Sequence, residues 1–396
     1  MAVRRDGASV HMELATGAAA AVFDGRIDGN SLAGTFTQGN ASGTFLLTRG
    51  VELTAAPTPP PPYREEEVRV SNGDITLAGT LTIPAGGGPF PAVVLITGSG
   101  PQDRDEDIFG FKVFRTIADH LTRQGVSVYR YDDRGVGSST GSLNVATTAD
   151  FAGDALAAVG MLRSRPDIDA RRVGLLGHSE GATVAAIAAF RSADVAFVVT
   201  LASPGVRGDE VLRQQAADGA RALGAGEEVV ARIVAAHRQA TDAVRMGQSA
   251  ESLASVVMEL VGAQYDSFPA AQRAAAGDRD AFVARTYRAG VAQLGTPWMR
   301  FMLDFDPAVA LRLVRCPVLA LFGSLDTQVV PSPNQANVRA ALAGNADATV
   351  KSYDGANHLF QQARTGLVTE YATLEKAFVP GLLDDLSAWI RLVTGR

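Results

Sequence analysis

Short, uninterrupted apolar runs alternate with amphipathic segments along most of the 396-residue chain, and this alternation restricts the fold more than any other feature. Runs of strand length cover residues 92–96, 126–131, 173–176, 195–201, 318–322 and 349–353, and segments of helical pattern cover 111–123, 151–162, 182–190 and 382–392. An apolar run without polar alternation is typical of a strand that is buried on both faces. The order therefore predicts the α/β class, with a mostly parallel, doubly wound sheet covered by helices.

The remaining segments complete a division into five parts. Residues 1–50 contain short apolar runs between Gly/Asn turns and predict a small N-terminal β-meander, and the proline-rich residues 51–63 predict a stiff linker. Residues 64–203 and 311–396 form the core, which begins with a hairpin at Asn72-Gly73. Residues 204–310 are rich in Ala, Arg, Glu and Gln and predict an inserted helical cap over the sheet.

Two stretches match Gly-x-Ser-x-Gly, the pattern that places a nucleophilic serine on a sharp turn between a strand and a helix. Gly177-His178-Ser179-Glu180-Gly181 follows the run 173–176 and precedes the helical segment 182–190. Gly137-Ser138-Ser139-Thr140-Gly141 lies among further Ser and Gly residues, which predicts a loop. Context therefore selects Ser179 as the candidate nucleophile, and we interpret the neighbouring His178 as a packing or support residue.

A serine hydroxyl needs a base to take its proton, and histidine is suited to this near neutral pH. Of five histidines, His358 lies directly after the last predicted strand, where this architecture carries its catalytic histidine. His11, His120 and His237 fall in the meander and in helical segments, where structural or surface roles suit them. We therefore expect His358 to be the base.

The acid partner is expected at the end of a strand between the nucleophile and the base in the chain. Asp326 follows the run 318–322 and satisfies this order. Asp304 and Asp306 precede that strand and suit capping or surface positions, and Asp354 after the last strand is the weaker competitor. Asp326 is predicted to hold the imidazole in one tautomer.

Negative charge that develops on a substrate carbonyl is usually held by two backbone N–H groups. One is expected from Glu180, which follows the nucleophile, and the other from Ser99, with Gly100 as the second choice, in the loop after the run 92–96. This loop has neither the Gly-Lys-Ser/Thr ending nor the Gly-x-Gly-x-x-Gly spacing of a phosphate-binding loop. The charged residues that follow it, Gln102-Asp103-Arg104-Asp105, and Asp132-Asp133-Arg134-Gly135 after a second strand are interpreted as bracing the loop.

Composition excludes several other classes of protein. The net charge of −6 and the pI near 5.5 argue against a nucleic-acid partner. The one cysteine, Cys316, rules out an intrachain disulfide and is interpreted as a small packing residue. No apolar run approaches the length that spans a bilayer and no secretory signal follows Arg4 and Arg5, so the default expectation is a soluble, cytoplasmic protein. An exported form is the expectation if the native N-terminus lies upstream.

The segment 96–104, the segment 131–135 and the Gly-His-Ser-Glu-Gly turn together resemble a bacterial branch of α/β-hydrolases. Its members are carboxylesterases, related in turn to serine aminopeptidase-like hydrolases. The resemblance runs from about residue 64 to the C-terminus and implies the α/β-hydrolase fold, hydrolysis of short acyl esters, a helical cap, and neither cofactor nor metal. Trp298, Phe301 and Met302 near the end of the cap are candidates for the acyl pocket, although core packing suits them equally. The turn departs from many relatives at Ala182, where they carry a second glycine.

The sequence thus predicts a serine carboxylesterase that acts on a small acyl ester, with a homodimer left open. Peptide or thioester hydrolysis remains an alternative because the same side chains serve all acyl transfers. A binding protein on a hydrolase scaffold is the remote alternative, and the complete set of catalytic residue types argues against it.

Overall fold

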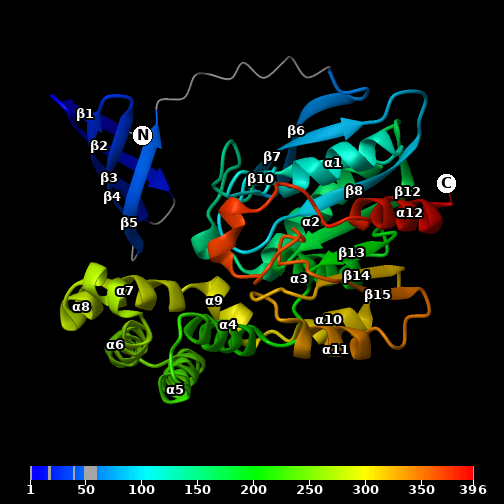
Figure 1. Cartoon of the computed structure of the whole chain (residues 1–396). Coiled ribbons are helices and arrows are strands. Elements are labelled where there is room, and N and C mark those ends of the chain that lie inside the picture. The colour runs from blue at the N-terminus through cyan, green and yellow to red at the C-terminus, as the bar shows by residue number, and fades with distance from the viewer. Residues whose placement is uncertain (1, 17–18, 39–40, 49–59, 396) are drawn as a thin grey trace. The chain divides into compact units, whose positions relative to one another are not determined.

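The apolar runs and the hairpin at Asn72-Gly73 together form one eight-stranded sheet in the computed structural model, which describes residues 2–16, 19–38, 41–48 and 60–395. In spatial order its strands are β15 (Ala348–Tyr353), β14 (Val318–Gly323), β13 (Val198–Leu201), β12 (Ile168–His178), β8 (Phe90–Ile96), β11 (Ser127–Tyr131), β7 (Ile75–Ile83) and β6 (Arg64–Asn72). Neighbours from β15 to β11 pair in parallel, and β7 pairs antiparallel with both β11 and β6. The expected α/β architecture, with a mostly parallel sheet, is confirmed (Figure 1).

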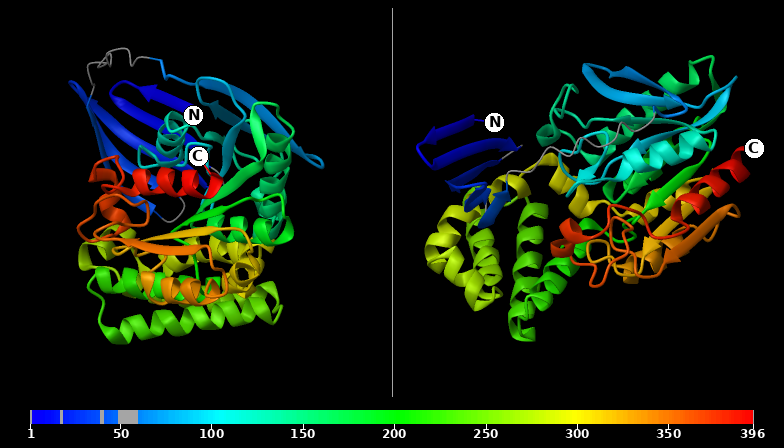
Figure 2. Two further views of the ribbon diagram at one scale, coloured as in Figure 1. Left: turned by 90° about the vertical axis from the view of Figure 1, so that its right-hand side faces the viewer. Right: turned by 45° about the horizontal axis from the view of Figure 1, so that its top comes forward.

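Helices cover both faces of this sheet (Figures 1 and 2). α2 (Thr148–Arg163) and α3 (Glu180–Arg191) pack on one face, and α1 (Val113–Arg123) and α12 (Leu382–Thr394) pack on the other. Strand β8 serves both cores, because Ala92, Val94 and Ile96 join the first and Val93 and Leu95 join the second. Successive side chains of a strand point to opposite faces, so an unbroken apolar run is what two cores require.

The parallel strands place their following loops at one edge of the sheet. Ser179 comes directly after β12, Asp326 shortly after β14 and His358 shortly after β15. The loop 97–101 follows β8, and Asp132 follows β11. Ligands of open α/β sheets bind at this carboxyl edge.

The chain divides into two compact units, residues 1–60 with 216–295 and residues 61–215 with 296–396. The first unit contains an antiparallel meander of β1 (Ala2–Asp6), β2 (Ser9–Thr16), β3 (Ala19–Asp28), β4 (Ser31–Gln38) and β5 (Ala41–Thr48). It also contains the helices α5 (Glu227–Arg245), α6 (Ala250–Asp266), α7 (Ala270–Ala276) and α8 (Arg279–Leu294). α4 (Gly208–Ala222) crosses the division, and α9 (Pro297–Asp304) and α10 (Pro307–Leu313) belong to the second unit.

Helices therefore occupy the region 204–310 as the sequence indicates, but the units divide inside that region and not at its ends. The five-part division, including a cap over the sheet, stays a prediction. Most of the expected proline-rich linker, residues 51–59, and part of the expected turn at 38–40 lie outside the described residues. Within the described chain, no helix is both long and apolar enough to cross a lipid bilayer.

Smaller elements complete the second unit. A two-stranded ribbon of β9 (Asp107–Ile108) and β10 (Phe111–Lys112) precedes α1, so the predicted helix 111–123 begins two residues later than the pattern indicates. The others are the 3-10 turns η1 (Leu143–Val145) and η2 (Val368–Thr373) and the helix α11 (Pro331–Ala341).

Candidate active site

The backbone turns sharply at Ser179, between the end of β12 and the start of α3. Its φ of 55° and ψ of −118° lie outside the regions that most residues adopt. The turn is possible because its flanking glycines allow close packing: a Cβ on Gly177 would collide with the backbone of Gly181, and a Cβ on Gly181 with the carbonyl of Ile96. The serine thus stands at the positive N-terminus of α3, in the geometry expected of a nucleophile.

His358 and Asp326 are hydrogen-bonded to each other, and both are buried. Nδ1 of His358 lies 2.8 Å from Oδ2 of Asp326. The other carboxylate oxygen accepts the backbone N–H groups of Gln328 at 2.8 Å and Val329 at 2.9 Å. An ionised carboxylate only accepts hydrogen bonds, so Nδ1 carries the proton and Nε2 is left as a base.

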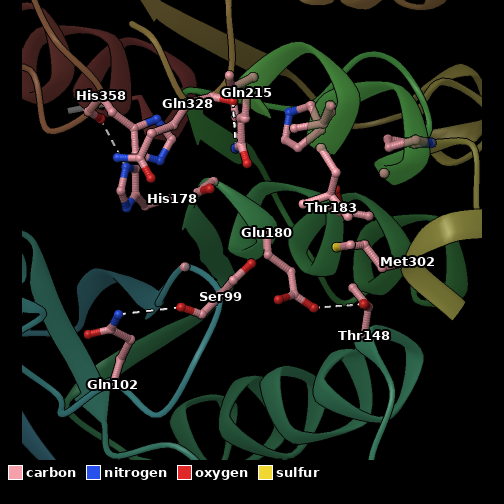
Figure 3. Close-up of a pocket in the computed structure, with 18 of the residues that line it drawn as sticks. Ser99, Gln102, Thr148, His178, Glu180, Thr183, Gln215, Met302, Gln328 and His358 are labelled. Carbon is pink, nitrogen blue, oxygen red and sulfur yellow. Dashed lines mark hydrogen bonds between the residues drawn. The ribbon is translucent and has the colours of Figure 1, made fainter. Parts of the chain in front are cut away.

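One pocket with a volume of about 400 Å³ collects most of the predicted site residues. Ser179 and His358 line it together, and Asp326 stands behind His358. The pocket is also lined by Ser99, Glu180, Trp298, Phe301 and Met302, as Figure 3 shows for those that it labels. Gly100, the second choice for the oxyanion donor, is not among the described residues that line it. The N–H of Glu180 is the first of α3, where amides have no acceptor within the helix.

The rejected candidates have structural roles elsewhere. The hydroxyl of Ser139 accepts the N–H of Ala78 at 2.9 Å and donates to the carbonyl of Asp132 at 2.7 Å, so it fixes a loop. Asp354 is exposed and accepts a hydrogen bond from Ser324. Asp306 caps α10 by accepting the N–H of Ala308.

The carboxyl of Glu180 organises one wall of the pocket. It accepts a hydrogen bond from Oγ1 of Thr148 at 2.7 Å (Figure 3) and another from Nε1 of Trp298 at 2.7 Å. Burial raises the pKa of Glu180, and these donors oppose that rise. The indole ring of Trp298 is therefore held in place by a hydrogen bond, a contact that apolar packing alone does not provide.

Charged residues brace the loop that carries Ser99, as the sequence suggested. Asp133 accepts the hydroxyl of Thr97 at 2.8 Å and the N–H of Gln102 at 3.0 Å, and these groups flank the loop on both sides. Its neighbour Asp132 forms a two-pronged pair with Arg104, at 3.0 and 2.8 Å. Burial raises the pKa of Asp133 to about 8.

The raised pKa of Asp133 predicts that stability falls as the pH rises. In the unfolded chain this carboxyl loses its proton near pH 4, whereas in the folded chain it keeps the proton until about pH 8. The contribution of Asp133 to the free energy of unfolding is therefore complete below about pH 4. It is lost as the pH rises through about 8, and the free energy of unfolding falls by up to about 1.4 kcal/mol per pH unit. Melting temperatures measured from pH 5 to pH 9 should decline less steeply in Asp133→Asn than in the parent. Equal slopes would contradict this assignment.

A buried pair that the sequence analysis missed lies beside the nucleophile. Oε1 of Glu106 is 2.8 Å from Nδ1 of His178 and accepts the N–H of Gly98 at 2.9 Å. The sequence placed His178 in a support role but gave no reason to select Glu106 from the acidic run that follows the loop. Its complete burial and its positive φ of 48°, in a residue other than glycine, are properties of the fold that have no signature in the sequence. The described residues contain no group of three or more His, Cys, Asp or Glu side chains arranged to hold a metal ion.

Comparison with known proteins shows that this chain is similar to hydrolases. A family model described as "Serine aminopeptidase, S33" matches residues 111–362, which contain Ser179, Asp326 and His358. Esterase EstD of Thermotoga maritima is 29% identical over 335 residues, covering 84% of this chain and 68% of EstD. Among solved structures, the Pyrococcus furiosus esterase Pf2001 has a TM-score of 0.50 at 13% identity and covers 83% of this chain and 91% of its own. The α/β-hydrolase GrgF from Penicillium sp. sh18 has a TM-score of 0.50 at 16% identity, covering 85% of this chain and 100% of its own.

Proposed function

Because the chain belongs to the serine aminopeptidase (S33) family of hydrolases and has the α/β-hydrolase fold, we propose that it is a serine carboxylesterase for short-chain acyl esters. One observation carries the proposal. The Asp326–His358 hydrogen bond orients a buried imidazole at the pocket that Ser179 also lines. The similarity to Esterase EstD supports the ester as the substrate class.

In the proposed mechanism the carboxylate of Asp326 keeps the proton of His358 on Nδ1, so that Nε2 accepts the proton of Ser179 as its oxygen attacks the ester carbonyl. The N–H groups of Ser99 and Glu180 stabilise the oxygen that becomes negative. His358 then protonates the departing alcohol, and the acyl group remains on Ser179. Water, deprotonated by the same imidazole, attacks the acyl-enzyme and releases the acid.

The lining of the pocket supports a small, weakly polar acyl group. Trp298, Phe301 and Met302 supply aromatic and thioether surface. A volume of about 400 Å³ lies near the lower end of the usual range for ligand pockets. We assign these three residues to the acyl site, and no metal or cofactor enters any step.

A peptidase of the aminopeptidase type is the second candidate, because the matching family model carries that description. The same residues would attack an amide or a thioester carbonyl.

The choice among these bonds is tested by one panel of substrates with matched acyl groups. We expect kcat/KM for p-nitrophenyl acetate and butyrate to exceed that for the corresponding p-nitroanilides and acyl-CoA thioesters by at least about 100-fold, equivalent to about 2.7 kcal/mol. Rates should also fall once the acyl chain outgrows the pocket. A clear preference for aminoacyl anilides would replace the esterase assignment with the peptidase one.

A further inference from the structure

The pair of Glu106 and His178 connects two loops of the active site. Glu106 accepts a hydrogen bond from the N–H of Gly98, and Gly98 directly precedes the proposed oxyanion donor Ser99. On the other side of the pair, Nε2 of His178 donates to the backbone carbonyl of His358 at 3.0 Å (Figure 3). One continuous path of hydrogen bonds therefore runs from the oxyanion loop to the proposed base.

The hydrogen bonds define where the protons lie. A carbonyl oxygen only accepts, so Nε2 of His178 carries a proton. Oε1 of Glu106 already accepts from Gly98, and an ionised carboxylate can accept the Nδ1 proton as well. A neutral imidazole has a single N–H, so His178 makes both bonds to an ionised Glu106 only when the ring is charged; the alternative is a protonated Glu106 that donates to Nδ1 of a neutral ring. Burial would lower the pKa of His178, but the charge and hydrogen bond of Glu106 outweigh it and raise the pKa.

This arrangement is costly if it only supports the fold. Glu106 is fully buried and is held at a φ of 48°, a conformation that costs energy in a residue other than glycine. Its second oxygen, Oε2, is buried without a hydrogen-bond partner among the described residues. An oxygen buried without a partner destabilises the fold, and a buried ion pair often stabilises no more than an apolar replacement does.

Gly98 lies close to both the nucleophile and the pair. A Cβ placed on Gly98 would lie 3.3 Å from Cβ of Ser179, 3.4 Å from Oε1 of Glu106 and 3.6 Å from Nδ1 of His178. The rings of His178 and His358 lie with their centroids 4.7 Å apart. Movement of either partner would therefore displace the oxyanion loop, the base or both.

We propose that Glu106 and His178 are positioning residues whose buried ion pair fixes the loop of Gly98 and Ser99 relative to the backbone of His358. The inference rests on the proposed function, because it assigns to the pair the alignment of the oxyanion donor with the base. Neither partner touches the substrate in this scheme.

Two conservative variants and their combination test the proposal. Glu106→Gln keeps an acceptor for Gly98 but removes the charge, and His178→Asn keeps a donor toward Glu106 but loses the one toward His358. Each should lower kcat for p-nitrophenyl butyrate by at least about tenfold while KM changes by less than about twofold. The double variant should be no slower than the slower single variant, because both break the same path. Rates are taken per active site, counted by complete labelling with a fluorophosphonate.

The pH profile provides a readout that a purely structural role would not change. The ionisable groups around His178 are Glu106, Asp326 and His358, and Asp133 lies near Glu106. Without the charge of residue 106, burial should hold the pKa of His178 below its ordinary value, so the ring of the variant is neutral above about pH 6.5 and keeps only one of its two hydrogen bonds. The kcat deficit of Glu106→Gln relative to the parent should therefore be largest near pH 6 and should narrow as the pH rises through the raised pKa of His178 in the parent. A deficit that is constant between pH 6 and pH 9 would overturn the proposed charge of His178.

A second ion pair, in which the carboxylate is buried, supplies the matched control. Asp154 is buried and pairs with Arg134 at 2.6 Å, yet it is not among the pocket-lining residues. Asp154→Asn should lower the melting temperature and leave kcat per labelled site unchanged. If Glu106→Gln and His178→Asn behave like this control, the pair is structural and the inference fails. If the parent protein itself is not labelled at Ser179, it is the proposed function that fails.

Discussion

Replacement of Ser179 by alanine should reduce kcat/KM for p-nitrophenyl butyrate by at least about 10⁴-fold while the protein remains folded. The reason is that no covalent intermediate can form without the hydroxyl, and the oxyanion donors alone supply only residual catalysis. The small side chain fits the strained turn as serine does, so the melting temperature should change little. The measurement combines steady-state kinetics with mass spectrometry of fluorophosphonate-treated protein, which should label the parent at Ser179 and leave the variant unlabelled.

Ser139 provides a control of the same residue type in the same sequence pattern. Ser139→Ala removes the two hydrogen bonds that join its loop to Ala78 of β7 and to the carbonyl of Asp132, and should cost stability, with kcat per folded molecule preserved. Hydrolysis at the parent rate by Ser179→Ala, or labelling of another serine, would remove Ser179 from the mechanism.

Replacement of Asp326 by asparagine should lower kcat by about 10³- to 10⁴-fold with KM nearly unchanged. The asparagine amide would donate to Nδ1 of His358, so the proton of the imidazole would move to Nε2, where a free lone pair is needed. The side-chain oxygen can still accept the N–H groups of Gln328 and Val329, so the loop should keep its structure. Stopped-flow kinetics should show that acylation itself is slowed.

The matched control for this variant is Asp354→Asn. Asp354 follows the last strand, is exposed and accepts a hydrogen bond from the hydroxyl of Ser324. Its replacement should leave kcat within about twofold of the parent. The reverse result, a large loss in Asp354→Asn and a small one in Asp326→Asn, would transfer the acid role to Asp354.

The sequence predicted the central sheet because its strands are buried on both faces. Val93 and Val94 enter different cores, and only an unbroken apolar run satisfies both. Where a segment is short or half-exposed, the pattern was less informative. The helix predicted at 111–123 begins at Val113, because Phe111 and Lys112 pair with the strand β9. Backbone hydrogen bonds hold this short pairing, and they produce no pattern of side chains that the sequence could reveal.

The candidate site was predictable to the extent that each residue follows a recognisable strand. Ser179, Asp326 and His358 all come directly or shortly after such strands, and the hydrogen bond between the last two agrees with the expected order. Glu106 could not be found in this way. It lies in a loop between β8 and α1, and its importance comes from burial and from His178, which is 72 residues away in the chain.

The pocket has a further consequence for the diversification of such enzymes. All of its described lining residues belong to the second unit, residues 61–215 and 296–396. Changes in the length or composition of residues 216–295 can therefore leave the contacts within that unit intact. Paralogues built on this plan are expected to preserve the second unit and to vary more freely in the inserted segment.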